Sequence, residues 1–261
     1  MNEVYRPIAQ PVRRNALRQK LGVAYFRLKK RLQWAFGNIK FGRQNSSNLP
    51  YEYFNNASPL LRNLAGIDPV LEQNKIVNLR IALSKINGVV LQPNEVFSFW
   101  KMIGKPTRHK GYVDGVILTD GSFSGGLGGG LCHLSGVIYW ATLHTPLDVI
   151  ERHRHGYDTT PQKFFGHDAT CFYNYKDLMI KNNTGQAFQL QIEITDDELV
   201  AVWKSDIPPN VSYEIYEKAG CFHVEDWGAT TRHNRVYRKT FDQNGVQIND
   251  EFISENHAIV M

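Results

Sequence analysis

Apolar residues recur at helical spacing in three segments of the first 150 residues. Residues 71–87 carry such a stripe up to Gly88, and residues 132–144 form another apolar stretch that is closed by Pro146. Residues 16–36 carry the longest stripe, which consists of Leu17, Leu21, Ala24, Tyr25, Leu28, Leu32, Ala35 and Phe36. The pattern therefore predicts three helices.

Alternation of apolar and polar positions marks the strands. Earlier β-prone pieces lie at 89–91, 96–99, 112–118, 147–155 and 168–175. From Gln186 onward alternation dominates and predicts strands at 188–194, 199–203, 211–217, 235–241 and 246–253. We expect these last strands to form an antiparallel sheet, and the whole chain to belong to the α+β class.

Charge divides the chain into a basic arm and an acidic body. Residues 1–45 hold eleven Lys and Arg against one acid, Glu3, which gives +10; since the whole chain carries +5, the remainder carries −5. We therefore expect a basic helical arm at 1–45, an α+β core at 46–185, and an antiparallel β region at 186–261 packed on that core. Because the body is acidic, no specific nucleic-acid partner is expected.

The basic helix at 16–36 has two interpretations. The simpler one is a helix that docks through its apolar stripe and leaves the charged face in water. The other is a helix that lies on an anionic membrane surface. The sequence shows no continuous apolar segment of signal-peptide or transmembrane length, so we expect a cytoplasmic protein, peripheral at the inner membrane if the second interpretation holds.

The chemistry-bearing segment is a glycine run that ends in a cysteine. Five glycines lie between 125 and 130, and Cys132 follows at the start of a predicted helix. A helix N-terminus favours thiolate over thiol, and its unpaired N–H groups can hold an oxyanion. We therefore expect Cys132 to be a nucleophile, with a binding loop formed by Gly128, Gly129, Gly130 and Leu131.

A nucleophilic cysteine needs a base and a group that orients the base. The predicted strand at 147–155 would place His153 and His155 on one face, and Asp168 opens the next predicted strand. A cysteine on a helix, then a histidine and an aspartate on successive strands, is the order of transglutaminase-like and papain-like enzymes. We predict a helix-plus-sheet core of that kind, in which Cys132 attacks an amide or ester; the choice between His153 and His155 stays open.

Other interpretations of these residues are open. Cys132 could fill a helix–sheet contact, and the glycine loop with both histidines could form an anion or carboxylate pocket in a binding protein without catalysis. A zinc site from Cys132, His153, His155 and Asp168 ranks third, because their spacing matches no metal motif. The three cysteines are an odd number and predict no disulfide framework, and the glycine run lacks a phosphate-loop Lys. No cofactor is expected.

The central segment, roughly residues 74–185, resembles the VanW family, which is named from vancomycin-resistance gene clusters. The resemblance rests on Asn94-Glu95-Val96-Phe97-Ser98-Phe99, Gly111-Tyr112, Gly128-Gly129-Gly130-Leu131-Cys132, Glu151-Arg152-His153-Arg154-His155 and Asp168-Ala169-Thr170. His133 stands where family members commonly have Gln, and Ser135 stands where they have Ser. The resemblance implies a role in glycopeptide resistance or cell-envelope metabolism. It also adds His133 and Ser135 to the expected binding residues for a small-molecule or peptide substrate.

Overall fold

The computed structural model describes residues 4–12, 14–61, 66–119, 121–159 and 164–261. These residues form an α+β protein, as the sequence pattern predicts. Its α-helices are α1 (Ala16–Phe36), α2 (Pro69–Ile86), α3 (Phe99–Ile103) and α4 (Leu131–Leu143), with a 3-10 helix at Arg108–Lys110. No helix in the described part of the chain is both long and apolar enough to span a bilayer.

The largest sheet forms the centre of the core. Its order is β1 (Arg43–Gln44), β3 (Val89–Leu91), β10 (Phe188–Ile194), β11 (Glu198–Ser205) and β2 (Tyr51–Pro59), with every pair antiparallel. Helix α4 packs against β11 and β2. The indole of Trp203 on β11 donates to the hydroxyl of Thr142 on α4 at 3.0 Å, and Asn56 on β2 donates to the carbonyl of Val137 at 3.0 Å. These bonds fix α4 on the sheet.

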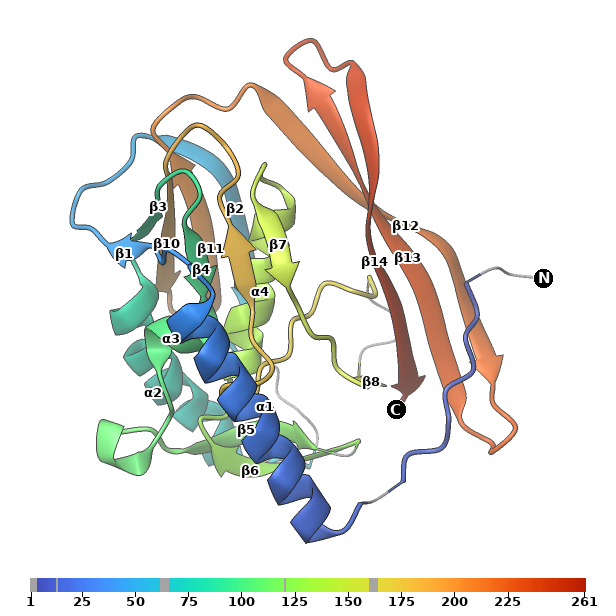
Figure 1. Ribbon diagram of the computed structural model, residues 1–261. Coiled ribbons are helices and arrows are strands. Elements are labelled where there is room, and N and C mark those ends of the chain that lie inside the picture. Colours follow the sequence, from blue (N-terminus) through green and yellow to red (C-terminus); the bar gives the residue numbers. More distant parts are fainter. Residues whose placement is uncertain (1–3, 13, 62–65, 120, 160–163) are drawn as a thin grey trace.

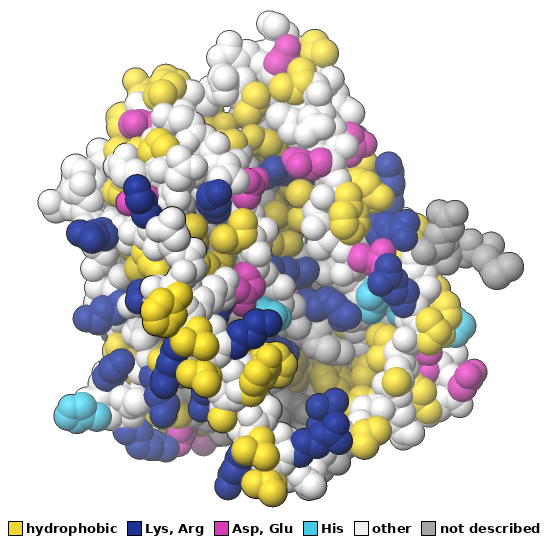
Figure 2. Space-filling view, viewed as in Figure 1, with side chains coloured by type: hydrophobic (Ala, Val, Ile, Leu, Met, Phe, Trp, Pro, Cys, Tyr) yellow, Lys and Arg dark blue, Asp and Glu magenta, His cyan; other side chains and the backbone are white. Residues whose placement is uncertain are grey.

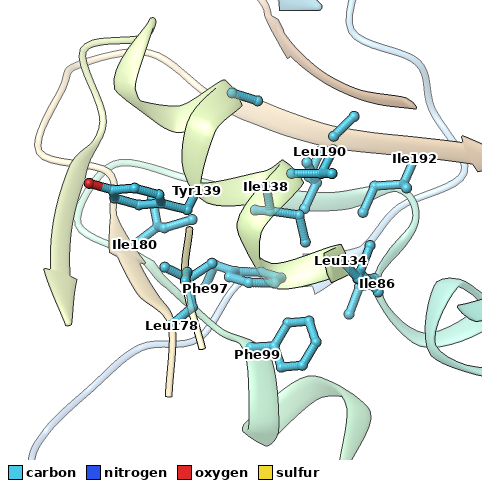
Figure 3. Packing of buried hydrophobic residues seen from close by; sticks show 14 of the residues in the cluster. Ile86, Phe97, Phe99, Leu134, Ile138, Tyr139, Leu178, Ile180, Leu190 and Ile192 are labelled. Atoms are coloured by element: carbon cyan, nitrogen blue, oxygen red, sulfur yellow. The ribbon is translucent and has the colours of Figure 1, made fainter. Parts of the chain in front are cut away.

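Helix α4 is buried on nearly all sides, which its apolar sequence favours. Figure 3 shows Leu134, Ile138 and Tyr139 from α4 packed among residues of the surrounding strands and of α2 and α3. Leu134 and Ile138 are fully buried. Burying a side chain of this size is worth about 1.5–3 kcal/mol. The helix that carries Cys132 is therefore held by the main core.

Two small sheets complete the core. One has the order β4 (Val96–Ser98), β9 (Met179–Lys181) and β7 (Asp148–Glu151), and the other pairs β5 (Asp114–Thr119) with β6 (Ser122–Leu127). Strand β7 ends at Glu151, so the predicted strand at 147–155 was wrong in its last four residues. The predicted strand at 168–175 was also wrong, because that segment holds only an isolated bridge between Phe172 and Lys176.

The C-terminal strands divide between two sheets, which corrects the expectation of a single antiparallel sheet. Strands β10 and β11 complete the core sheet. The others, β12 (Val211–Val224), β13 (Thr230–Asp242) and β14 (Gln247–Val260), form a second sheet, and β8 (Tyr157–Asp158) joins β14 as a parallel edge strand. In Figure 1 these long orange-to-dark-red strands stand beside the core.

Helix α1 packs on the protein through the side opposite to the apolar stripe, whereas the simpler prediction was that the stripe itself would be docked. The apolar stripe faces outward, with 68% of Leu17 and 82% of Phe36 exposed, whereas Lys30 is buried at 5%. The Lys30 ammonium pairs with the carboxylate of Glu151 and lies 3.7 Å from that of Asp177. The prediction that the stripe would be buried was wrong, because carboxylates from distant segments hold the side of the helix that carries Lys30.

Candidate active site

The glycines before Cys132 are explained by backbone geometry. Gly128 has φ +77° and Gly130, the N-cap of α4, has φ +98°, a region that L side chains rarely adopt. A Cβ on Gly129 would lie 2.1 Å from the carbonyl carbon of Gly115 on β5. Gly128 and Gly129 are also buried. Gly128 and Gly129 therefore pack the start of α4 against β5, and a ligand-binding role for the Gly128–Leu131 loop stays a prediction.

Cys132 is the second residue of α4 and lies at the positive end of the helix. Among the residues that the structure describes, its backbone N–H has no acceptor. The neighbouring N–H of Leu131 donates to the carbonyl of Gly128 over 3.4 Å, and the Leu131 side chain is buried. The free N–H of Cys132 is thus the donor that could hold an oxyanion.

The sulfur of Cys132 is surrounded by polar groups of the segment that follows Asp168, among them the carbonyl oxygen of Cys171 at 3.4 Å. The backbone N–H of Cys171 lies 3.4 Å from the sulfur, the thiol of Cys171 3.6 Å, and the hydroxyl of Thr170 3.6 Å. The hydrogen bond from the Cys171 thiol does most to lower the pKa of Cys132; burial opposes it, and the hydrogen bond and charge of His155 add to it. The net result is a pKa of Cys132 well below the ordinary thiol value, whereas burial raises that of Cys171.

His155 is the histidine that faces this sulfur. Its Nδ1 lies 2.7 Å from Oδ2 of Asp168, and its backbone N–H donates to the same oxygen at 2.8 Å. Burial alone would lower the pKa of His155, but hydrogen bonds with Asp168 and Cys132 outweigh burial and raise it to about 9. Because Asp168 holds Nδ1, Nε2 is the nitrogen left for the sulfur.

Arg152 fixes the carboxylate of Asp168. Its guanidinium lies 3.0 Å from Oδ1 of Asp168, and its Nε donates to the Asp168 carbonyl at 2.8 Å. It also donates to the carbonyl of Gly166 and to Oδ1 of Asn256 on β14, the latter at 2.7 Å. Burial would raise the pKa of Asp168, but the hydrogen bond from His155 and the charge of Arg152 lower it. Asp168 therefore stays ionised and orients the imidazole.

His153 is directed elsewhere. Its Nε2 lies 3.1 Å from the carboxylate of Glu151, which also binds Lys30 of α1. Because β7 ends at Glu151, the alternation that would place His153 and His155 on one face does not continue to them. The structure brings Cys132, His155 and Asp168 together and leaves the His153 ring against the carboxylate of Glu151.

The two residues added by the family resemblance have contacts within the fold. Nε2 of His133 lies 2.8 Å from the hydroxyl of Ser58 on β2. Ser135 is fully buried, and its hydroxyl donates to the carbonyl of Ala169 at 2.6 Å. That bond ties α4 to the segment that carries Asp168 and Cys171. Ser135 thus holds these two segments together, and its expected role in substrate binding stays a prediction.

Reasoning from the sequence missed three residues of this arrangement: Arg152, Thr170 and Cys171. One signal was present, because Thr170 and Cys171 follow Asp168 so closely that whatever brings Asp168 to Cys132 brings them too.

Comparison with known proteins places these residues in a recognised family. Residues 74–203 match the family model described as "VanW like protein", and this range includes Cys132, His155 and Asp168. The chain is 31% identical over 194 residues to the "Vancomycin B-type resistance protein VanW" of Enterococcus faecalis, an alignment that covers 73% of this chain and 70% of that protein. It is 29% identical over 131 residues to the "Uncharacterized protein YoaR" of Bacillus subtilis, covering 50% of this chain and 43% of that protein. No solved structure matches the chain.

Proposed function

The chain belongs to the VanW family, and we propose that it acts as a cysteine-dependent hydrolase or acyltransferase on an amide or ester. The observation that carries this proposal is the contact of Asp168 with both Arg152 and Nδ1 of His155, the imidazole that stands close enough to Cys132 to lower its pKa. Such a set supplies a nucleophile, a proton carrier and an orienting carboxylate in the roles that acyl transfer requires.

The two pKa shifts support the same assignment. The pKa of Cys132 is lowered, first by the hydrogen bond from Cys171 and further by His155, and the pKa of His155 is raised to about 9 by Asp168 and Cys132 against the effect of burial. Both shifts favour the charged pair, a Cys132 thiolate beside a His155 imidazolium. That is the resting state of an activated thiol nucleophile.

The proposed reaction has two steps. The Cys132 thiolate forms a bond to the carbonyl carbon, and the carbonyl electron pair moves to oxygen, where the free N–H of Cys132 donates to it. The intermediate collapses to a thioester and expels an amine or alcohol, which takes its proton from the His155 imidazolium. Water, or an acceptor amine or alcohol, then attacks the thioester while neutral His155 takes its proton, and the Cys132 thiolate is released.

The fold context of the proposal is a thiol-enzyme-like core. Cys132 lies on the buried helix α4, His155 follows β7, and Asp168 lies in the segment packed against α4 through Ser135. This helix–histidine–aspartate order agrees with the transglutaminase-like and papain-like arrangement. It is an analogy of order and roles.

The proposal for the substrate class rests on the name of the Enterococcus faecalis relative. That protein is called a vancomycin B-type resistance protein, and the family resemblance implies a link to cell-envelope metabolism. We accordingly include in the proposal that the amide or ester belongs to a small peptide-bearing or acylated component of cell-envelope metabolism. The contacts described above favour the reaction class and do not select the substrate.

Alkylation tests the nucleophile. We expect iodoacetamide to modify Cys132 about tenfold faster than a free thiol near pH 6, because a low-pKa cysteine is largely thiolate there. The site of modification is measured by peptide mass spectrometry, with Cys171 and Cys221 as internal references. His155→Ala should reduce the rate, whereas the matched variant His153→Ala should leave it within about twofold, because His153 pairs with Glu151. An unreactive Cys132 in the folded protein would contradict the proposal.

A simple ester tests acyl transfer itself. We expect p-nitrophenyl acetate to release p-nitrophenolate in a burst equal to the amount of enzyme and to leave an acetyl thioester on Cys132. Cys132→Ser should abolish the thioester, and Cys221→Ser should not. Rapid alkylation without any acetyl adduct on Cys132 would favour the non-catalytic binding protein instead.

A further inference from the structure

Helix α1 presents an apolar surface that the fold does not cover. Six large side chains lie on one side of the helix, spaced three or four residues apart, and are 48–82% exposed. They are Leu17, Leu21, Tyr25, Leu28, Leu32 and Phe36. The opposite side faces the protein through Val23, Arg27, Lys30 and Trp34, which are buried or half-buried. Exposed apolar stripes of this length usually mark a binding surface.

Cations border the exposed stripe on both sides. Helix α1 contains six Lys and Arg and no Asp or Glu. At 100° per residue, Arg18 and Lys29 fall along one edge of the stripe, and Lys20 and Arg31 fall toward the other. All four are exposed, and none has an acidic partner among the residues that the structure describes. Figure 2 shows hydrophobic and basic side chains adjoining one another along this helix.

Polar contacts on the buried side of α1 keep the apolar stripe facing the solvent. Nε of Arg27 donates to the carbonyl of Tyr173 at 2.8 Å, and Lys30 is held by Glu151 and lies 3.7 Å from Asp177. These polar contacts fix the rotation of α1 about its axis. The apolar stripe therefore remains exposed in the folded protein without any rearrangement.

We propose that this face of α1 lies in the interface of an anionic phospholipid membrane. An apolar stripe edged by Lys and Arg is the arrangement that buries side chains among acyl chains while the cations meet lipid phosphates. Each cation near an anionic surface adds about 1 kcal/mol of attraction. Charge complementarity selects an anionic bilayer over a second copy of this chain, because two copies joined through this face would bring their cations together.

The proposal is independent of the acyl-transfer chemistry, although the two share a location. The carboxylate of Glu151 binds Lys30 on α1, and Glu151 ends the strand that leads to His155. A membrane-bound α1 would hold the Cys132 site near the lipid surface.

Vesicle sedimentation of the full chain tests the proposal. We expect the protein to sediment with vesicles that contain phosphatidylglycerol, to bind phosphatidylcholine vesicles at least about tenfold more weakly, and to be released by high salt. The double variant Leu21→Glu/Leu28→Glu should weaken binding by about tenfold or more. Circular dichroism and the rate of Cys132 alkylation report whether the variant keeps its fold.

The chain offers a matched control on another exposed surface. Val246 lies just before β14, and Ile248 is the second residue of that strand. Their side chains are 57% and 58% exposed, which is close to the exposure of Leu21 (63%) and Leu28 (56%). Val246→Glu/Ile248→Glu adds the same charge and should bind vesicles like the wild type. The proposal is overturned if the full chain does not sediment with anionic vesicles, or if both double variants lose vesicle binding equally. It is also overturned if the protein self-associates through Leu21 and Leu28 and does not bind vesicles. Binding that survives in Cys132→Ser separates this result from the proposed catalysis.

Discussion

His155 and His233 are both enclosed by hydrogen-bond partners, but their pKa values move in opposite directions. The pKa of His155 is raised to about 9 because hydrogen bonds with Asp168 and Cys132 outweigh the effect of burial. His233 is fully buried on β13, and its pKa is lowered to about 4, mainly by burial and then by the charge of His257. Its ring nitrogens lie 2.8 Å from the hydroxyl of Thr231 and 2.7 Å from Nδ1 of His257.

The difference lies in the charge of the direct partners. His155 has a carboxylate at one nitrogen and a sulfur with a lowered pKa near the other, so the charged imidazolium is stabilised. His233 has a neutral hydroxyl and another imidazole as direct partners, and the charge of Glu225 offsets only part of the cost of burial. The same residue type is thus charged beside Cys132 and neutral in the C-terminal sheet, and the comparison can be tested from both sides.

Asp168→Asn should have the largest effect. The amide keeps an oxygen for Arg152 but removes the negative charge, so the pKa of His155 should fall and that of Cys132 should rise toward the ordinary value. A thiol near its ordinary pKa is only a few per cent thiolate at pH 7, so alkylation of Cys132 should slow about thirtyfold. The measurement is the rate of iodoacetamide labelling against pH. An unchanged midpoint would show that Asp168 does not control the pair.

Cys171→Ala should have the next largest effect. It removes the thiol 3.6 Å from the Cys132 sulfur, the hydrogen bond that contributes most to the lowered pKa of Cys132. We expect the pH midpoint of Cys132 alkylation to rise, with a loss of about tenfold in rate at pH 6. Cys171→Ser keeps an O–H donor at this position and should lose less. Equal rates in both variants and the wild type would mean that the contact between the two sulfurs does not tune reactivity.

His233→Gln should have the smallest effect and the opposite dependence on pH. The pKa of His233 is about 4 in the folded protein and about 6.5 when unfolded. Its contribution to stability is therefore present above about pH 6.5 and lost as the pH falls toward 4. Glutamine cannot take up the proton, so the slope of unfolding free energy against pH in this window should decrease by about one proton, or ~1.4 kcal/mol per pH unit.

Urea unfolding at several pH values between about 4 and 8 measures this slope. Above pH 7 the wild type and His233→Gln should have parallel pH dependences, which serves as the internal control. Identical slopes below pH 6 would show that His233 takes up no proton on unfolding.

The sequence predicted those parts of the fold that depend on local periodicity. Helix α4 spans 131–143 against the predicted 132–144, and β10 spans the predicted 188–194. Alternation identified most C-terminal strands but not their sheets, because periodicity does not specify a pairing partner. Strand β10 pairs with β3, whereas β13 pairs with β12 and β14.

The site residues themselves depend on contacts that periodicity cannot encode. The choice of His155 over His153 follows from the end of β7 at Glu151, which pairing with β9 determines. The outward stripe of α1 follows from Lys30, whose carboxylate partners lie more than a hundred positions away in the chain. In each case a distant charged or hydrogen-bonded partner outweighed the local pattern.

The contact between Arg152 and Asn256 sets a practical limit on dissecting this protein. Cys132, His155 and Asp168 all precede β12, yet the guanidinium that holds Asp168 also donates to Asn256 on the last strand, at 2.7 Å. A fragment that stops at the end of β11 would contain every group of the proposed reaction but leave that guanidinium without its side-chain acceptor on the C-terminal sheet. The smallest unit that keeps all the contacts of the Arg152 guanidinium therefore extends into the final strand.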